Sequence, residues 1–241
     1  MSVPRTAQTF VLVHGAWHGG WCWSRVTRLL RAKGHTVYAP TLTGLGERVH
    51  LARADIGLEI HVEDIVRVLS SEELTGVVLV GHSYAGLLLP GIADLSIDRI
   101  RHVVCLDGAV PREGESGMDT ITPEIQERWR RVASQSGWMP PAYDFLGVSD
   151  AGDLNWLKRR LVPHPFKSWC DAVERHGDGY DRAPKTFIRC TLPLEKPPSL
   201  SAVRAQKASD WDYREIDAGH DAMVTAPGAL AKMLDEIGRG S

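Results

Sequence analysis

A serine at a predicted sharp turn is the residue of this sequence best suited to chemistry. Ser83 lies in VVLVGHSYAG, after a β-branched run and before the apolar run 85–89. A serine hydroxyl becomes a nucleophile when a strained turn exposes it beside a base and near N–H groups that stabilise an oxyanion. Gly81 and Ala85 flank it as in the nucleophile elbow G-x-S-x-G, with one extra methyl group at Ala85. The alternative is a serine that only caps a helix.

A histidine near the carboxyl end could supply the base. The segment REIDAGHDAM predicts a strand, a loop containing His220, and the start of a final amphipathic helix. In hydrolases whose triad follows the chain order serine, acid, histidine, the base lies on such a loop. A solvent-exposed loop histidine would be the better interpretation without Ser83. Together, Ser83 and His220 predict acyl transfer through a serine nucleophile.

Two carboxylates compete as the acid that would orient His220. Glu195 is the only carboxylate in the loop after KTFIRCT, the usual place for this acid, but a surface ion pair explains it equally well. Asp107 lies at the end of the predicted strand in HVVCLDG, directly before Gly108. A residue at a strand terminus could aim its carboxylate at the imidazole. We favour Asp107. Its alternative role is to cap the turn before Gly108.

A glycine-rich loop near the amino end could complete an oxyanion site. In VLVHGAWHGGWCW, a strand-like run ends and a loop leads into a helix, so the N–H of Ala16 is expected to converge with that of Tyr84. A phosphate-binding loop is a weak alternative, because the glycine fingerprints of nucleotide sites are absent. His14 and His18 fit structural hydrogen-bonding residues better than metal ligands. We therefore expect neither a cofactor nor a metal.

These residues lie far apart in the sequence and need a scaffold that brings them together. Helical spacing of apolar residues at 23–32 and 60–69 predicts helices between strands. The alternation predicts an α/β fold with a mostly parallel, doubly wound sheet. Buried strands are predicted at TFVLVHG, TVYAPTL, GVVLVGHS, HVVCLDG, KTFIRCT and DYREID.

One long interval interrupts this alternation. We predict a hydrolase core at 1–108 and 185–241, with 109–184 inserted as a cap over the carboxyl ends of the strands, where open α/β folds bind ligands. The alternative is a helical excursion with a small core of its own. The interval contains half of the eight tryptophans of the chain, namely Trp129, Trp138, Trp156 and Trp169.

Composition limits the classes of partner. The 241 residues carry a net charge of -2 and a pI of about 6.5, so a nucleic-acid or anionic membrane surface is not expected. No apolar run approaches the roughly 20 residues of a membrane span, and the first residues lack a secretory pattern. The four widely spaced cysteines form no C-x-x-C pair. We expect a cytoplasmic protein, with monomer and homodimer both open.

The motifs VLVHGAWHGGWCW, VGHSYAG and AGHDAM together resemble the α/β-hydrolase superfamily. The resemblance is to plant methylesterases, hydroxynitrile lyases and their small bacterial esterase and carbamate-hydrolase-like relatives, and it covers nearly the whole chain outside the cap. It implies an α/β-hydrolase fold in which Ser83 is the nucleophile and His220 the base. It also implies that the amides of Ala16 and Tyr84 form the oxyanion hole.

The sequence departs from this family at informative positions. Plant methylesterases carry the acid soon after the strand matching KTFIRCT, where this sequence has apolar residues and proline at 192–194. Bacterial relatives resembling carbamate-fungicide hydrolases have an aspartate at the position of Asp107, which implies a shifted acid. Hydroxynitrile lyases place threonine and lysine where this sequence has Gly15 and Asp221, so lyase activity is disfavoured.

The function predicted from these features is a serine carboxylesterase. It would cleave a small apolar or aromatic ester through an acyl-enzyme, since the cap is rich in aromatic residues. A carbamate, an amide or a lactone could be cleaved by the same residues. A ligand-binding protein without catalysis is a hypothesis of another class, and the presence of both Ser83 and His220 argues against it.

Overall fold

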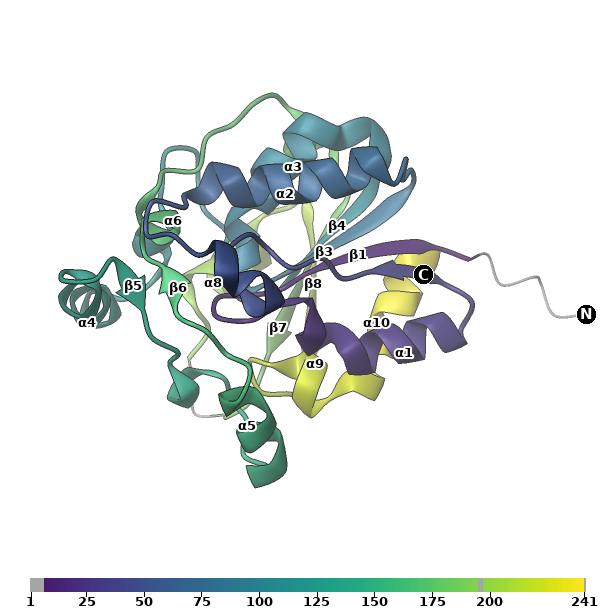
Figure 1. The fold of residues 1–241 in the computed structure, drawn as a ribbon. Helices are drawn as coiled ribbons and strands as arrows, with labels where there is room; N and C mark the ends of the chain where they lie inside the picture. The colour runs from purple at the N-terminus through teal and green to yellow at the C-terminus, as the bar shows by residue number, and fades with distance from the viewer. Residues whose placement is uncertain (1–6, 195–196, 241) are drawn as a thin grey trace, which may run out of the picture.

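Runs of aliphatic and β-branched residues form a six-stranded sheet at the centre of the molecule (Figure 1). The computed structural model describes residues 7–194 and 197–240. Every pairing in this sheet is parallel, and the strand order is β2-β1-β3-β4-β7-β8. The strands are β1 (Thr9–Val13), β2 (Thr36–Tyr38), β3 (Val77–His82), β4 (Ile100–Leu106), β7 (Lys185–Cys190) and β8 (Trp211–Ile216). The six predicted strands are confirmed.

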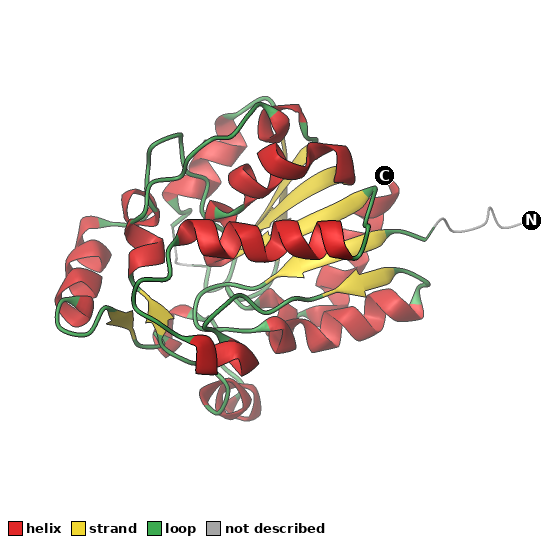
Figure 2. Ribbon diagram, turned by 45° about the horizontal axis from the view of Figure 1, so that its top comes forward, coloured by secondary structure: helices red, strands yellow, loops and turns green. Residues whose placement is uncertain are grey.

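Amphipathic helices cover both faces of the sheet. Helices α1 and α10 lie on one face and α2 and α3 on the other, as Figures 1 and 2 show. The predicted parallel, doubly wound architecture is thereby confirmed. The helices outside residues 109–184 are α1 (Ser24–Ala32), α2 (Leu58–Ser71), α3 (Leu89–Ser96), α8 (Leu200–Lys207), α9 (Ala222–Thr225) and α10 (Pro227–Arg239). The 3₁₀ turns there are η1 (Gly20–Trp23), η2 (Gly46–Leu51), η3 (Ser83–Leu87) and η4 (Ile97–Arg99).

The parallel topology explains how distant residues meet. Because all strands of the sheet run the same way, their carboxyl ends lie at one edge. Ala16 follows β1, Ser83 follows β3, Asp107 follows β4 and His220 follows β8. The sheet therefore delivers four segments of the sequence to the same edge.

The helix after Ser83 is interrupted near Pro90. A short 3₁₀ turn, η3, precedes α3, and Pro90 lies in the first turn of α3, where a missing N–H removes no helical hydrogen bond. The turn η3 rests on the segment after β4. A Cβ atom built on Gly86 would lie 2.2 Å from the backbone oxygen of Ala109. The close contact holds the Ser83 turn next to the end of β4.

The inserted segment lies beyond the carboxyl ends of the strands (Figure 1). It includes a small antiparallel sheet of β5 and β6 that the sequence pattern did not predict. Its division from the core as a cap stays a prediction. Its elements are η5 (Gly117–Thr120), α4 (Pro123–Ala133), β5 (Trp138–Met139), η6 (Tyr143–Phe145), α5 (Ala151–Lys158), β6 (His164–Pro165), α6 (Lys167–Cys170) and α7 (Gly179–Arg182).

Two tryptophans of the inserted segment pack onto the loops at the sheet edge. The rings of Trp129 and Trp169 lie 4.8 Å apart, centroid to centroid. The ring centroids of Trp129 and Trp17 lie 6.2 Å apart, and those of Trp169 and Tyr84 lie 5.5 Å apart. Both are buried, with exposures of 8% and 5%. The inserted segment and the sheet therefore share an aromatic core.

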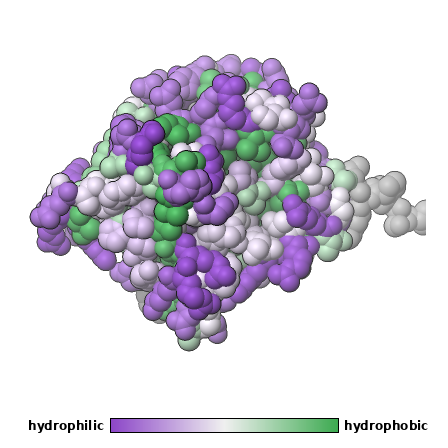
Figure 3. All heavy atoms as spheres, viewed as in Figure 1, coloured by the Kyte–Doolittle hydropathy of each residue, from purple (hydrophilic) through white to green (hydrophobic). Residues whose placement is uncertain are grey.

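The outer surface is mostly polar. Figure 3 shows one face that is largely hydrophilic, with a band of hydrophobic side chains across it. Val49 and Leu51 of η2 are among the exposed large hydrophobic residues. Within residues 7–194 and 197–240, no helix is both long and apolar enough to cross a membrane.

The close packing of Gly86 on Ala109 predicts the effect of adding a methyl group at position 86. Gly86→Ala should lower the free energy of unfolding by about 1–3 kcal/mol, because the new Cβ would collide with backbone that cannot easily move. Gly228→Ala is the matched control, since a Cβ at Gly228 meets no atom within 4 Å. Urea unfolding measures both. Equal stability of the two variants would contradict the close packing of Gly86 on Ala109.

Candidate active site

Three side chains from three loops form a hydrogen-bonded row at the sheet edge. Ser83 Oγ lies 2.8 Å from His220 Nε2, and His220 Nδ1 lies 2.6 Å from Asp107 Oδ2. A carboxylate only accepts, so the Nδ1–H of His220 donates to Asp107 and leaves Nε2 to accept from the Ser83 hydroxyl. This is the geometry in which an imidazole can remove the proton of a serine.

Backbone strain aims Ser83 at the imidazole. Ser83 has a φ of 55°, a left-handed conformation that is uncommon for any residue except glycine. The turn is held by the N–H of Ala109, which donates to Ser83 O at 3.0 Å. Ala85, where the sequence departs from the elbow pattern, is fully buried and fits the turn. The extra methyl group does not prevent the strand–turn–helix arrangement that the motif predicts.

Asp107 also sits in a strained turn, with a φ of 43°. Its N–H donates to Ile188 O at 2.7 Å, and its Oδ1 accepts from Cys190 N–H at 3.3 Å. These bonds to β7 direct the other carboxylate oxygen toward His220. The competing acid, Glu195, lies outside the described residues. The assignment of the acid to Asp107 therefore stays a proposal.

The two predicted oxyanion donors belong to the segments that follow β1 and β3. The Nδ1–H of His14 donates to Gly15 O at 2.8 Å, and because the peptide is planar and trans this turns the Ala16 N–H the opposite way. Ala16 and Ser83 line the same small hollow. Tyr84 is in the first turn of η3, where an N–H has no helical partner.

Two buried histidines next to this row are neutral. Burial lowers the pKa of both His14 and His82 to about 3. His82 donates from Nε2 to the backbone oxygen of His220 at 2.9 Å, and its ring centroid lies 4.7 Å from that of His220. His82 thus holds the loop that carries His220 in place. His14 is the structural hydrogen-bonding residue that the sequence indicated.

A second imidazole–carboxylate pair was not predicted from the sequence. His18 Nε2 lies 3.1 Å from Asp221 Oδ2, and both side chains are buried. The two residues are 203 positions apart in the sequence. No local pattern links them, and the only signal was that each belongs to a motif near the predicted site.

The hollow at Ser83 is small and closed by the inserted segment. It is too narrow to hold a water molecule. Leu146 lines it, and the ring of Phe145 lies 4.6 Å from that of His220. An acyl group could enter only if residues of this segment moved.

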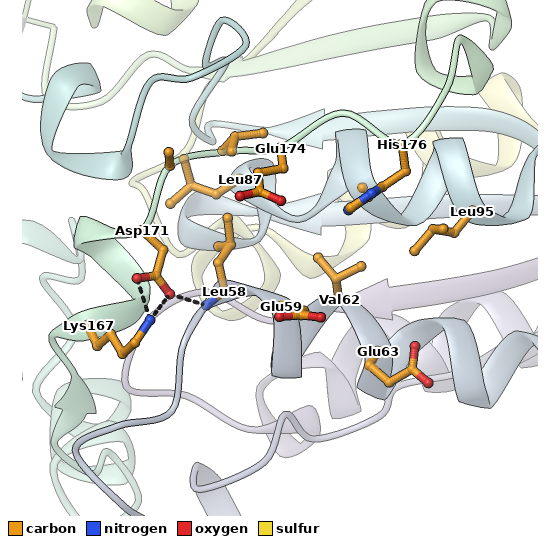
Figure 4. Close-up of a pocket in the computed structure, with 13 residues that line it drawn as sticks. Leu58, Glu59, Val62, Glu63, Leu87, Leu95, Lys167, Asp171, Glu174 and His176 are labelled. Carbon is orange, nitrogen blue, oxygen red and sulfur yellow. Dashed lines mark hydrogen bonds and ion pairs between the residues drawn. The ribbon is translucent and has the colours of Figure 1, made fainter.

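A larger groove of about 510 Å³ lies elsewhere, between α2 and the segment 171–176 (Figure 4). Its floor is apolar and its rim is mostly acidic. In Figure 4 the carboxylate of Asp171 bonds to Lys167 and to the N–H of Leu58. Ser83, Asp107 and His220 do not line this groove. It therefore contributes nothing to the chemistry at Ser83.

Comparison with known proteins identifies the family of the chain. The model of the alpha/beta hydrolase family matches residues 10–233. The chain belongs to this family. A carbendazim hydrolyzing esterase from Nocardioides sp. is 35% identical, covering 95% of this chain and 99% of the relative. Methylesterase 2 of Arabidopsis thaliana is 33% identical over 89% of this chain and 75% of that protein.

Solved structures of the alpha/beta hydrolase family share the fold. An extracellular alpha/beta-hydrolase from a Paenibacillus species superimposes with a TM-score of 0.84 at 22% identity, covering 94% of this chain and 97% of the other. A methylesterase from Arabidopsis has a TM-score of 0.73 at 22% identity, with coverage of 95% and 97%. The predicted fold, family and enzyme class, a hydrolase of ester bonds, are confirmed.

The buried neutral histidines predict an acid-sensitive fold. Unfolded histidine takes up a proton near pH 6.5, whereas folded His14 and His82 do so only near pH 3. The unfolded state therefore binds more protons as the pH falls below 6.5. As the pH falls below 6.5, each of these two histidines should lower the free energy of unfolding by about 1.4 kcal/mol per pH unit.

Urea unfolding at pH 7, 6 and 5 measures this slope. His82→Asn should reduce the slope, and His50→Gln, which changes an exposed histidine, should leave it unaltered. A free energy of unfolding that stays constant from pH 7 to pH 5 would show that these histidines are not buried in the neutral form.

Proposed function

We propose that this chain is a serine carboxylesterase with the triad Ser83, His220 and Asp107. The observation that carries the proposal is the row of hydrogen bonds from Asp107 through His220 to Ser83, at 2.6 and 2.8 Å. The esterase relatives support the same reaction class. We assign the oxyanion hole to the amides of Ala16 and Tyr84.

The first half of the proposed reaction forms an acyl-enzyme. Ser83 Oγ attacks the ester carbonyl carbon while its proton passes to His220 Nε2. The carbonyl oxygen becomes negative and accepts hydrogen bonds from the two amides. The tetrahedral intermediate then breaks its bond to the alkoxy group, which takes the proton from His220 and leaves as an alcohol.

The second half returns the enzyme to its starting state. Water attacks the acyl carbon and gives its proton to His220 Nε2, and collapse of the intermediate returns that proton to Ser83 Oγ. The acid product then leaves. Asp107 holds the Nδ1–H of His220 in both halves, so the imidazole keeps the tautomer that can accept at Nε2.

A small apolar or aromatic ester is the proposed substrate. The apolar residues Ala16, Trp17 and Leu146 border the hollow at Ser83, next to His18 and Asp221, whose side chains bond to each other. Residues of the inserted segment must move before any acyl group enters, and a small movement would admit only short acyl groups. A carbamate, an amide or a lactone would use the same residues, so the bond cleaved must be tested directly.

The direct test is hydrolysis of p-nitrophenyl and methyl aryl esters by the wild type and by Ser83→Ala. Turnover should fall by roughly 10³–10⁴-fold or more in the variant, because the nucleophile is gone. Parallel assays with carbamates, amides and lactones define the bond type. Undiminished ester hydrolysis by Ser83→Ala would refute the mechanism.

The identity of the acid is tested by two matched variants. Asp107→Ala should reduce kcat by about 10³–10⁴-fold, because His220 loses the partner that fixes its tautomer. Glu195→Ala should leave kcat within about twofold, as substitutions away from a reacting group do. Circular dichroism checks that both variants fold. The reverse result would assign the acid to Glu195.

Leu146 should limit the size of the acyl group. Leu146→Ala is expected to raise kcat/KM for p-nitrophenyl butyrate relative to acetate by roughly tenfold, since room for a methylene is worth about 1–3 kcal/mol. Leu69→Ala is the control, because it removes an equally buried leucine from α2. The same change in selectivity in both variants would mean that Leu146 does not border the acyl site.

A further inference from the structure

Both ring nitrogens of His18 face oxygen atoms that accept hydrogen bonds. Nδ1 lies 2.7 Å from the backbone oxygen of Ala16, and Nε2 lies 3.1 Å from Asp221 Oδ2. A backbone carbonyl cannot donate, and an ionised carboxylate cannot either. A neutral imidazole has one N–H and could satisfy only one of these partners. The geometry therefore requires two protons on His18 when Asp221 is ionised.

Among the residues that the structure describes, His18 is the side chain that hydrogen-bonds to the Asp221 carboxylate. The Asp221 side chain is fully buried, and its other oxygen, Oδ1, has no hydrogen-bond partner within the described chain. His82, whose Nε2 is 4.0 Å from Asp221 Oδ1, is neutral because burial lowers its pKa to about 3. His14, directly after β1, is neutral for the same reason, and burial raises the pKa of the Cys22 thiol.

The directions of the pKa shifts of His18 and Asp221 agree with a protonated His18 and an ionised Asp221. Burial alone would lower the pKa of His18, but the charge of Asp221 and the bonds to Asp221 and Ala16 raise it above the ordinary value. Burial alone would raise the pKa of Asp221, but His18 lowers it. A lone buried carboxylate next to His220 would be costly, whereas a hydrogen-bonded pair is tolerated.

The pair joins three parts of the site. His18 binds the carbonyl of Ala16, in the loop whose amide we assign to the oxyanion hole. Asp221 directly follows His220, the proposed base. The N–H of Asp221 donates to the backbone oxygen of Leu146 at 2.9 Å, which ties the same residue to the inserted segment.

We propose that His18 and Asp221 form a buried imidazolium–carboxylate pair that positions the oxyanion loop 15–17 against the loop of His220. The inference rests on the proposed function, because it assigns these residues a role in the same reaction. Both residues line the hollow at Ser83, and the hydrogen bonds of their side chains go to Ala16 and to each other. They are positioning residues, and their effect on the rate passes through Ala16 and His220.

The orientation of the Ala16 peptide explains why this contact matters. His14 holds the carbonyl of Gly15, on one side of Ala16, and His18 holds the carbonyl of Ala16 itself. The next amide, that of Trp17, donates to His164 Nδ1 at 3.4 Å. Trp17 has a φ of 68°, so this loop is strained and needs such restraints. Loss of the His18 bond would free the peptide that follows the oxyanion donor.

The charge of the pair can be read without an activity assay. In the folded full-length protein with ¹⁵N-labelled histidine, NMR should show both ring nitrogens of His18 protonated at pH 8. In Asp221→Asn, the asparagine amide can donate to Nε2, so His18 should become neutral while its Nδ1–H still binds Ala16 O. A neutral His18 in the wild type at pH 8 would overturn the proposal.

The positioning role is tested by the separation of kcat from KM. Asp221→Asn and His18→Gln should each lower kcat for an aryl ester by roughly 10–100-fold, with KM changed less than about threefold, because oxyanion bonds strengthen in the transition state. His18→Asn should retain more kcat than His18→Gln when both are made in the Asp221→Asn background. The asparagine can still place an N–H near the former Nδ1 and bind Ala16 O.

The histidine–carboxylate pair of His35 and Asp235 supplies the control for stability. His35 Nε2 lies 2.9 Å from Asp235 Oδ1, between β2 and α10 and far from Ser83 in the fold. Asp235→Asn should reduce stability and leave kcat unchanged. If Asp221→Asn also leaves kcat unchanged, the positioning role is overturned. Absence of ester turnover in the wild type would instead overturn the proposed function and the positioning role with it, whereas the NMR result still reports the charge of His18.

Discussion

The hydrogen bond from His220 to Asp107 is the interaction on which the proposed chemistry depends. It joins two loops whose residues are 113 positions apart, and it determines which nitrogen of the imidazole is left to accept from Ser83. The bond can form because β4 and β8 end at the same edge of a parallel sheet. Contacts around the two loops hold His220 and Asp107 within hydrogen-bond distance of each other.

The loop of His220 is restrained from several directions. The N–H of Asp221 binds Leu146 O, and His82 binds the backbone oxygen of His220. Gly219 packs so closely on Gly147 that an added Cβ would lie 1.9 Å from the Gly147 oxygen. These contacts connect the base to the sheet and to the inserted segment. The loop of the proposed base therefore packs directly against the inserted segment.

The sequence was sufficient to predict the scaffold and the proposed triad residues because both follow from local patterns. β3 is buried at every position, which produces an unbroken apolar run, and Ser83 directly follows it. The strands β5 and β6 are two residues long and carry no periodicity that could reveal them. Asp107 was favoured from its place at the end of a predicted strand, whereas its backbone turn, with a φ of 43°, is not encoded in that pattern.

Longer-range contacts were beyond the reach of sequence patterns. His18 and Asp221 each belong to a motif singled out for another residue, and their contact depends on how β1 and β8 are placed in the sheet. The tryptophans of the inserted segment suggested a cap over a ligand site, which stays a prediction, and two of them pack against Trp17 and Tyr84. Aromatic residues in an insertion can serve packing and shape a site at the same time.

The most direct test of the central claim is capture of the acyl-enzyme. A rapid-quench reaction with a p-nitrophenyl ester, followed by peptide mapping by mass spectrometry, should find the acyl mass on the peptide containing Ser83. The adduct should form at the rate of the p-nitrophenol burst and disappear as the acid product forms. Sustained ester turnover without an adduct on Ser83, or with the acyl group on another residue, would contradict the account.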